Sequence, residues 1–232
     1  MEKEILVQSH PEATVVALVE DGRLAEIHLE RTAGRRLVGN IYKGRVANIL
    51  PGMQAAFVDL GIGRNGFLYL KEPRGGAGRG PGLEEGQSLL VQVVKEPLGG
   101  KGPRVTRRPT LPGRHLVLVP GADNVAVSRR IQDRERREEL RRLVQTLRPP
   151  GLGFIVRTAA ENSSEADLAA EVRGLSRLWQ QIETRARQVK APALLHRDLE
   201  LVARVLRDFY SGEVTRVRFN SADTMQRAAE AA

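Results

Sequence analysis

Two phenylalanines, Phe57 and Phe67, stand among basic residues in a chain with only 4% aromatic side chains. Aromatic rings exposed on a small β-barrel can stack nucleic-acid bases while lysine side chains follow the phosphates. Lys95 and Lys101 bracket a Leu-Gly-Gly turn after a predicted strand and could hold such a backbone. The alternative is that both rings belong to the barrel core and both lysines are solvated. These four residues predict a candidate site for single-stranded nucleic acid.

A second candidate is the pair Arg157–Thr158, at the end of the apolar stretch 153–158. A guanidinium fork beside a hydroxyl and backbone amides makes a socket for a terminal phosphate. Arg-Thr pairs also end strands that bind nothing, so the pattern by itself leaves a structural role open.

Other chemistries find little support in the residue types. The four histidines share no metal-ligand spacing, and there is no cysteine to supply thiolate ligands. The sequence contains neither a Gly-Xaa-Ser-Xaa-Gly elbow nor a phosphate loop. Asp59 lies in an apolar strand, where we expect it to pair with an arginine or a backbone amide. We therefore predict no catalytic residue, metal site or cofactor in this chain.

The charge balance favours a polyanionic partner. The 232 residues carry 37 Lys and Arg against 28 Asp and Glu, for a net charge of +9. Nucleic acid is the commonest partner of so basic a chain, although an arginine-rich composition is an alternative explanation. No apolar run is long enough to span a membrane, and the acidic residues among the first twenty argue against a signal peptide. The expected location is the cytoplasm.

The front half of the chain, which must position the two phenylalanines, reads as β-structure. Asp21-Gly22 favours a tight hairpin turn between two early strands, and apolar residues on both faces predict that this hairpin is buried on both sides. Short β-runs separated by glycine-rich turns then predict a small antiparallel barrel. A basic connector at 31–38 and a glycine-rich loop at 71–87 are expected beside it. The expected strands are 4–9, 13–20, 23–30, three runs within 43–70, 88–95 and 104–107.

The second half mixes helices and strands, so the fold class is α+β. Asn162 and Glu165 resemble a capping arrangement that opens a long helix, with Trp179 on its apolar face as a core residue. The arginine-rich helix before it is expected to be solvated. The expected strands are 115–119, 126–128, 153–158 and 214–219, and the expected helices are 131–147, 164–188, 198–210 and one that Ser221 caps.

Five stretches carry a resemblance to a known family: Gly-Asn-Ile-Tyr-Lys-Gly-Arg-Val at 39–46, residues 50–59, Gly-Phe-Leu at 66–68, Ser-Arg-Arg-Ile at 128–131 and residues 155–159. Together they closely resemble the N-terminal half of the bacterial ribonuclease E/G family, over essentially the whole chain. The resemblance implies an antiparallel OB-type β-barrel and an α/β 5′-sensor domain inserted into an incomplete RNase H-like subdomain. The implied segments are 1–35 and 203–232 for the RNase H-like subdomain, 39–106 for the RNA-binding barrel and 107–202 for the 5′-sensor.

The resemblance also implies roles for individual residues. In the family, barrel aromatics and lysines grip single-stranded RNA, and a sensor socket receives a 5′-monophosphate. Val117 would touch the terminal base, while the other sensor positions would hold or shape the phosphate site. The matching RNA-binding positions are Phe57, Phe67, Lys95 and Lys101, and the matching 5′-phosphate positions are Gly113, Val117, Arg129, Arg157 and Thr158.

The family's hydrolytic centre does not match any segment of this chain. In the family, aspartates that hold Mg²⁺ and a cysteine-rich zinc link that joins subunits both lie further along than Ala232. We therefore expect this chain to bind single-stranded RNA with a 5′-monophosphate end, within an endoribonuclease for rRNA processing and mRNA decay, without cutting RNA itself. Homo-oligomers are possible in the family, but this chain offers no support for one. Two alternatives stay open: an active nuclease whose catalytic domain is supplied elsewhere, and a non-catalytic RNA or protein interaction module.

Overall fold

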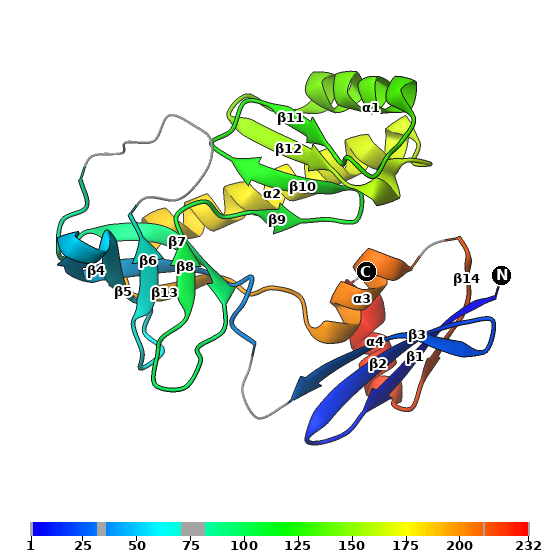
Figure 1. The fold of residues 1–232 in the computed structure, drawn as a ribbon, viewed down its shortest axis with the longest axis horizontal. Coiled ribbons are helices and arrows are strands. Elements are labelled where there is room, and N and C mark those ends of the chain that lie inside the picture. Colours follow the sequence, from blue (N-terminus) through cyan, green and yellow to red (C-terminus); the bar gives the residue numbers. More distant parts are fainter. Residues whose placement is uncertain (1, 32–35, 71–81, 211, 232) are drawn as a thin grey trace. The chain divides into compact units, whose positions relative to one another are not determined.

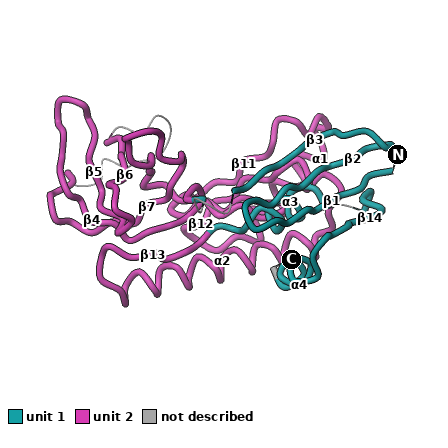
Figure 2. Tube along the Cα trace, turned by 90° about the horizontal axis from the view of Figure 1, so that it is seen from below, with its two compact units in different colours: residues 1–36, 198–232 teal, residues 37–197 magenta. Residues whose placement is uncertain are grey.

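The computed structural model describes residues 2–31, 36–70, 82–210 and 212–231. The chain divides into two compact units, one made of residues 1–36 and 198–232 and the other of residues 37–197 (Figures 1 and 2). Parts of the predicted connector (32–35) and of the predicted glycine-rich loop (71–81) lie outside the described residues. Among the residues that are described, no helix is both long and apolar enough to cross a membrane.

The first unit joins the two ends of the chain in one four-stranded sheet, in the order β14-β1-β2-β3. β1 pairs antiparallel with β2 and parallel with β14, so strands more than 200 positions apart lie side by side. Two helices pack on the face that carries Ile5, Val16 and Leu18. The elements are β1 (Lys3–Ser9), β2 (Ala13–Glu20), β3 (Arg23–Arg31), α3 (Leu201–Phe209), β14 (Val214–Phe219) and α4 (Ala222–Ala231).

The predicted hairpin forms, but the expectation that it is buried on both faces is wrong. Asp21 and Gly22 take positive φ angles of 48° and 75°, as the predicted tight turn requires. On β3, however, Leu24, Ile27 and Leu29 are 61%, 64% and 59% exposed. Helices of this unit cover only one face of the sheet, so the apolar residues on the other face stay at the surface.

The second unit contains a closed five-stranded barrel, which confirms the predicted α+β class with an OB-type barrel. Its strand pairs are antiparallel except for β6 and β8, which run parallel. The strands follow the order β4-β5-β6-β8-β7, and β7 pairs back onto β4. Val58, Leu68 and Val91 fill its interior. A Cβ at Gly44 would lie 2.4 Å from a methyl carbon of Val58, so only glycine fits the tight packing there. The elements are β4 (Ile41–Leu50), the 3₁₀ turn η1 (Pro51–Met53), β5 (Ala55–Asp59), β6 (Gly66–Tyr69), β7 (Ser88–Lys95) and β8 (Arg104–Thr106).

The rest of the second unit is a four-stranded mixed sheet in the order β11-β12-β10-β9, with two helices on one face. Leu116, Leu118 and Phe154 point into the core beneath the helices, and Trp179 is only 7% exposed, so its predicted core position is confirmed. Assignment of this part as a 5′-sensor, and of each segment to a named domain, stays a prediction. The elements are β9 (Leu111–Pro112), β10 (Leu116–Pro120), β11 (Val125–Val127), α1 (Arg134–Leu147), β12 (Leu152–Val156), η2 (Thr158–Ala160), α2 (Glu165–Gln188) and β13 (Ala193–His196), which pairs with β4.

The long helix α2 begins at a different cap from the predicted one. Asn162 and Glu165 do not form the capping arrangement; Ser164 is the N-cap and forms a capping box with Asp167. The Ser164 hydroxyl accepts a hydrogen bond from the Asp167 amide, and the Asp167 carboxylate accepts one from the Ser164 amide. The 3₁₀ turn η2 comes just before and moves the helix start past Asn162.

Candidate nucleic-acid interface

The two phenylalanines lie on the outer face of the barrel. Phe57 on β5 is directly opposite Phe67 on β6, with ring centroids 5.9 Å apart in an edge-to-face arrangement. Their strand neighbours Val58 and Leu68 are fully buried inside the barrel, and side chains alternate between the two faces of a strand. Both rings are partly exposed. The register thus places them where a base could reach them, rather than in the interior.

Cationic side chains continue the same row around the barrel. Phe67 pairs with Arg104 on β8, and Arg104 pairs with Lys95 at the end of β7. Paired residues on neighbouring strands share a face, so Phe57, Phe67, Arg104 and Lys95 form a row across four strands. We call these four residues the barrel row. Lys101 is exposed and lies in the turn between β7 and β8.

Tyr69 and Arg104 were missed by the sequence reasoning. Tyr69 follows Phe67 by two positions on β6 and therefore shares its face; the two ring centroids are 4.9 Å apart. The guanidinium carbon of Arg104 lies 4.7 Å from the centroid of the Tyr69 ring. The alternation Phe-Leu-Tyr was visible in the sequence, but the strand pairing that brings Arg104 to this ring was not.

Two basic residues at the start of the barrel have a structural role instead. The Lys43 ammonium donates hydrogen bonds to the carbonyls of Ala186 (2.7 Å) and Val189 (2.9 Å), at the end of α2. Arg45 donates to the carbonyl of Ala191 at 2.6 Å. Cations are stabilising at a helix C-terminus, where carbonyls lack helical partners. These side chains thus hold α2 to the barrel within the second unit.

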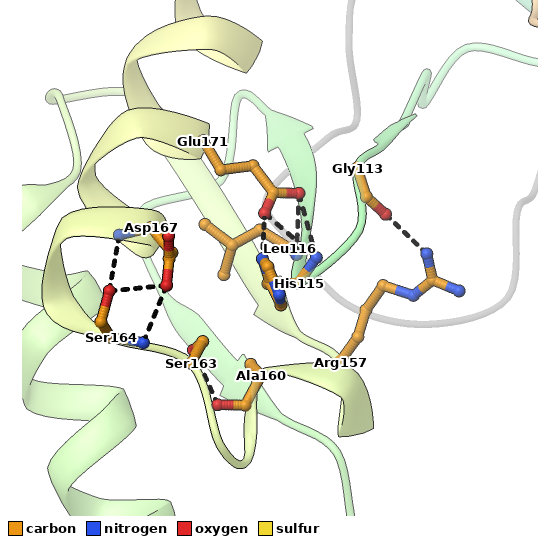
Figure 3. A network of polar contacts seen from close by, with 9 residues as sticks. All are labelled: Gly113, His115, Leu116, Arg157, Ala160, Ser163, Ser164, Asp167 and Glu171. Atoms are coloured by element: carbon orange, nitrogen blue, oxygen red, sulfur yellow. Dashed lines mark hydrogen bonds and ion pairs between the residues drawn. The ribbon is translucent and has the colours of Figure 1, made fainter. Parts of the chain in front are cut away.

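Two of the predicted phosphate-binding residues, Arg157 and Gly113, are in contact at one end of the mixed sheet (Figure 3). Arg157 follows β12; its amide donates to the carbonyl of His115 at 2.8 Å, and its guanidinium donates to the carbonyl of Gly113 at 2.5 Å. The hydroxyls of Thr158 and Ser128 lie 3.1 Å apart. The structure therefore brings Arg157 to Gly113, and Thr158 to the segment that precedes Arg129.

Val117 and Arg129 lie nearby on the exposed side. Val117 pairs with Ile155 on β12 and with Pro112 on β9, on the sheet face that the helices leave uncovered. Ile155, which sequence reasoning missed, is 40% exposed. Arg129 follows Ser128 directly and is exposed. An apolar surface thus adjoins the end of the sheet that carries Arg157.

Glu171 of α2 organises the loop before β10, and sequence reasoning missed this residue too. Its carboxylate accepts hydrogen bonds from the amides of His115 (3.1 Å to each oxygen) and Leu116 (3.3 Å), and it lies 2.8 Å from the Nδ1 atom of His115 (Figure 3). The carbonyl of Gly113, in the same loop, is held by Arg157. Loop 113–116 is therefore fixed by one acidic and one basic side chain from separate elements.

The capping box of α2 also affects an ionisable group. The hydrogen bond from the Ser164 hydroxyl (2.6 Å) is the main cause that lowers the pKa of Asp167 below its usual value, and the Ser164 amide adds to it. Asp167 and Glu171 are about one helical turn apart on α2 and therefore lie on the same side of the helix.

Asp59 behaves as a structural carboxylate. Its Oδ1 accepts a hydrogen bond from the amide of Gly61 at 2.9 Å, which confirms the predicted pairing with a backbone amide. In the described parts of the chain, no three or more His, Asp or Glu side chains gather into a group that could hold a metal ion.

The closed barrel and the mixed sheet beside it define an α+β protein with an OB-type barrel as its class. The chain belongs to the Ribonuclease E/G family, whose family model matches residues 110–232. It is 44% identical over 235 residues to Ribonuclease G of Escherichia coli (strain K12), an overlap of 95% of this chain and 48% of that protein. It is 41% identical over 232 residues to Ribonuclease G of Haemophilus influenzae (94% and 47%) and 38% identical over 234 residues to Ribonuclease E of Nostoc sp. (98% and 34%).

These comparisons confirm the resemblance that the sequence motifs indicated. The chain spans about half the length of the Ribonuclease G relatives that it matches.

Proposed function

We propose that this chain is the RNA-binding and 5′-end-recognising part of a ribonuclease E/G-type endoribonuclease that acts in rRNA processing and mRNA decay. The observation that carries the proposal is the barrel row, in which two outward aromatic rings are followed by two cations. Family membership supports RNA as the polyanion. No cleavage step is part of this proposal, since no three or more His, Asp or Glu side chains gather into a possible metal site in the described ranges.

In this proposal, RNA bases stack on Phe57 and Phe67 while Lys95 and Lys101 contact the phosphates. Stacking on an aromatic ring contributes about 1–3 kcal/mol per base and is largely independent of sequence. Each phosphate neutralised on a single strand steepens the dependence of log K on log salt by about 0.7. Binding should therefore be weakened by salt and show little base preference.

The 5′ end is assigned to the loop that Arg157 and Glu171 hold. A terminal monophosphate would accept hydrogen bonds from the Arg157 guanidinium and the Thr158 hydroxyl, with Arg129 as a further cation and Gly113 shaping the loop. The bond from Arg157 to the Gly113 carbonyl fixes the guanidinium plane before ligand arrives. The terminal base would lie against the apolar surface at Val117.

The test compares labelled single-stranded RNA of one sequence that carries a 5′-monophosphate, a 5′-triphosphate or a 5′-hydroxyl. We expect the monophosphate to bind tightest and Arg157→Ala to remove that preference, while binding of the 5′-hydroxyl RNA is retained. Equal affinity for all three ends, unchanged by Arg157→Ala, would contradict recognition of the 5′ end.

The barrel is tested with the 5′-hydroxyl RNA alone. Phe57→Leu combined with Phe67→Leu keeps apolar bulk but removes both ring faces, and we expect at least tenfold weaker binding, which corresponds to about 1.4 kcal/mol. Lys95→Gln should also weaken binding, whereas Lys190→Gln, at another exposed position, serves as the matched control. Normal binding by the double phenylalanine variant would refute the stacking role.

Cleavage is tested separately. With Mg²⁺ and a labelled single-stranded RNA, the purified chain alone should leave the RNA intact. Specific cleavage products that persist through a further purification step would overturn the assignment of this chain to binding only.

A further inference from the structure

Tyr69 and Arg104 form an exposed cation–π pair beside the two phenylalanines. Tyr69 is 39% exposed, and its ring meets Phe67 edge-to-face with an interplanar angle of 85°. The Arg104 guanidinium lies over the Tyr69 ring, 4.7 Å from its centroid. The ring thus limits the conformations of a long side chain that would otherwise be free in solvent.

Arg104 also lies across from another cation. It is the strand partner of Lys95 on β7, at an irregularity in the pairing of β7 and β8. Like charges on neighbouring strands are destabilising when they lie close together. A bound polyanion would offset this repulsion, so the pair suits a surface that is occupied by phosphate.

The size of the barrel row fits several nucleotides. Neighbouring strands are about 4.8 Å apart, so the three steps from Phe57 to Lys95 span roughly 14 Å. Nucleotides stacked with the rise of about 3.4 Å found along a duplex strand would place about four of them over this length. The rings at one end suit bases, and the cations at the other end suit the backbone that follows.

We propose that Arg104, held over the Tyr69 ring, is a further RNA-binding residue that contacts a backbone phosphate next to the bases on Phe57 and Phe67. Tyr69 acts through Arg104 and is a positioning residue. A guanidinium that a ring already holds in place loses less conformational entropy when it binds a phosphate with two parallel hydrogen bonds. This inference rests on the proposed function of the barrel.

The experiment measures binding of a 5′-hydroxyl single-stranded RNA over a range of salt concentrations, so that recognition of the 5′ end plays no part. Arg104→Gln should weaken binding about tenfold at low salt and reduce the magnitude of the log–log salt slope by about 0.7, because one phosphate contact is lost. Tyr69→Leu should weaken binding by a smaller factor, about threefold, with the slope unchanged, because the charge remains but is less well placed. Tyr69→Phe keeps the ring and should bind like the parent chain.

The outcomes separate the inference from the proposed function. If Arg104→Gln keeps both the affinity and the slope while the double phenylalanine variant loses affinity, the barrel binds RNA and the inference about Arg104 is wrong. If Tyr69→Leu binds like Tyr69→Phe, the positioning role of Tyr69 is wrong. If the parent chain does not bind this RNA, or if the double phenylalanine variant binds it as tightly as the parent does, the proposed function fails as well. Lys190→Gln again controls for a general loss of positive charge.

Discussion

Gly113 and Glu171 are packed so closely that the glycine cannot carry a side chain without displacing the carboxylate. A Cβ built on Gly113 would lie 1.9 Å from Oε1 of Glu171, the same oxygen that accepts hydrogen bonds from the amides of His115 and Leu116. Real Cβ atoms essentially never come within 3.0 Å of such a neighbour. The requirement for glycine here thus comes from another side chain and not from the backbone angles.

The first prediction is that Gly113→Ala destabilises the chain by about 1–3 kcal/mol. The added methyl group must push Glu171 away, which leaves buried amide donors without their acceptor. Urea denaturation of the parent and the variant measures the change. The same substitution should also remove the preference for a 5′-monophosphate, because it moves the loop that Arg157 contacts.

The control is a double-mutant cycle with Glu171→Ala. Once the carboxylate is absent, the methyl group at position 113 has no close neighbour of that kind, so Gly113→Ala should cost much less in this background. Residues in direct contact show coupling energies of about 0.5–3 kcal/mol. If the destabilisation by the double variant equals the sum of the two single changes, contact with Glu171 is not the reason for glycine at position 113.

The second prediction contrasts two lysines of the barrel. Lys43→Met should lower the melting temperature but leave RNA affinity nearly unchanged, because its ammonium binds two carbonyls at the end of α2. Lys95→Met should do the reverse, since Lys95 lies exposed in the barrel row. Thermal unfolding and RNA titration of both variants check this. Loss of stability in both, or loss of affinity in both, would contradict the division of roles.

The third prediction concerns pH and the capping box. The pKa of Asp167 is lowered in the folded chain, so its carboxylate stabilises the fold above the unfolded pKa, whose usual value is 3.8, and this contribution is lost as the pH falls through the lowered folded pKa. The melting temperature of Asp167→Asn should therefore be lower than that of the parent near pH 7, with the difference shrinking below about pH 3.8. Ser164→Ala removes the hydroxyl partner and should cost about 1 kcal/mol. A difference that grows on acidification would refute this account.

The fourth prediction concerns an ion pair within the first unit. The Arg204 guanidinium lies 3.2 Å from the Glu30 carboxylate, with the arginine side chain 11% exposed. Burial is the main cause that lowers the pKa of Arg204. Glu30→Ala should destabilise the chain by about 3 kcal/mol because it leaves a buried cation without its carboxylate, whereas Arg204→Met should cost less. Urea denaturation of both variants measures the two changes in the free energy of unfolding. Equal destabilisation by Glu30→Ala and Arg204→Met would contradict this prediction.

Local patterns predicted the strands, the barrel and the core position of Trp179, because each depends on residues close together in the sequence. The orientation of Phe57 and Phe67 was left open for a physical reason. Phe57 has Ala56 and Val58 beside it, so both faces of β5 look apolar, and only the pairing within a closed barrel decides which face is inside. The same limit explains the error on the hairpin, which was expected to be buried on both faces although Leu24, Ile27 and Leu29 of β3 are exposed.

Contacts between distant segments could not be predicted from the sequence for a related reason. Glu171 and His115 are 56 positions apart in the sequence, and no local pattern around either residue predicts that they are in contact. The cap of α2 shows the same limit at short range. Asn162 and Glu165 have the spacing of a capping box, as Ser164 and Asp167 do, and the spacing alone does not say which pair the helix uses.

The pairing of β1 with β14 sets the order in which the chain can fold during synthesis. Lys3 forms an ion pair with Glu213, 210 positions further along, so the sheet of the first unit is incomplete until β14 has been made. Because synthesis proceeds at about 5–20 residues per second, β14 is made roughly 10–40 s after β1. All of the residues of the barrel and of its neighbouring sheet are synthesised in that interval. β1 can thus pair with β2 soon after synthesis, but its pairing with β14 and the cover that α3 and α4 give to its apolar residues come only when the second segment of this unit has been made.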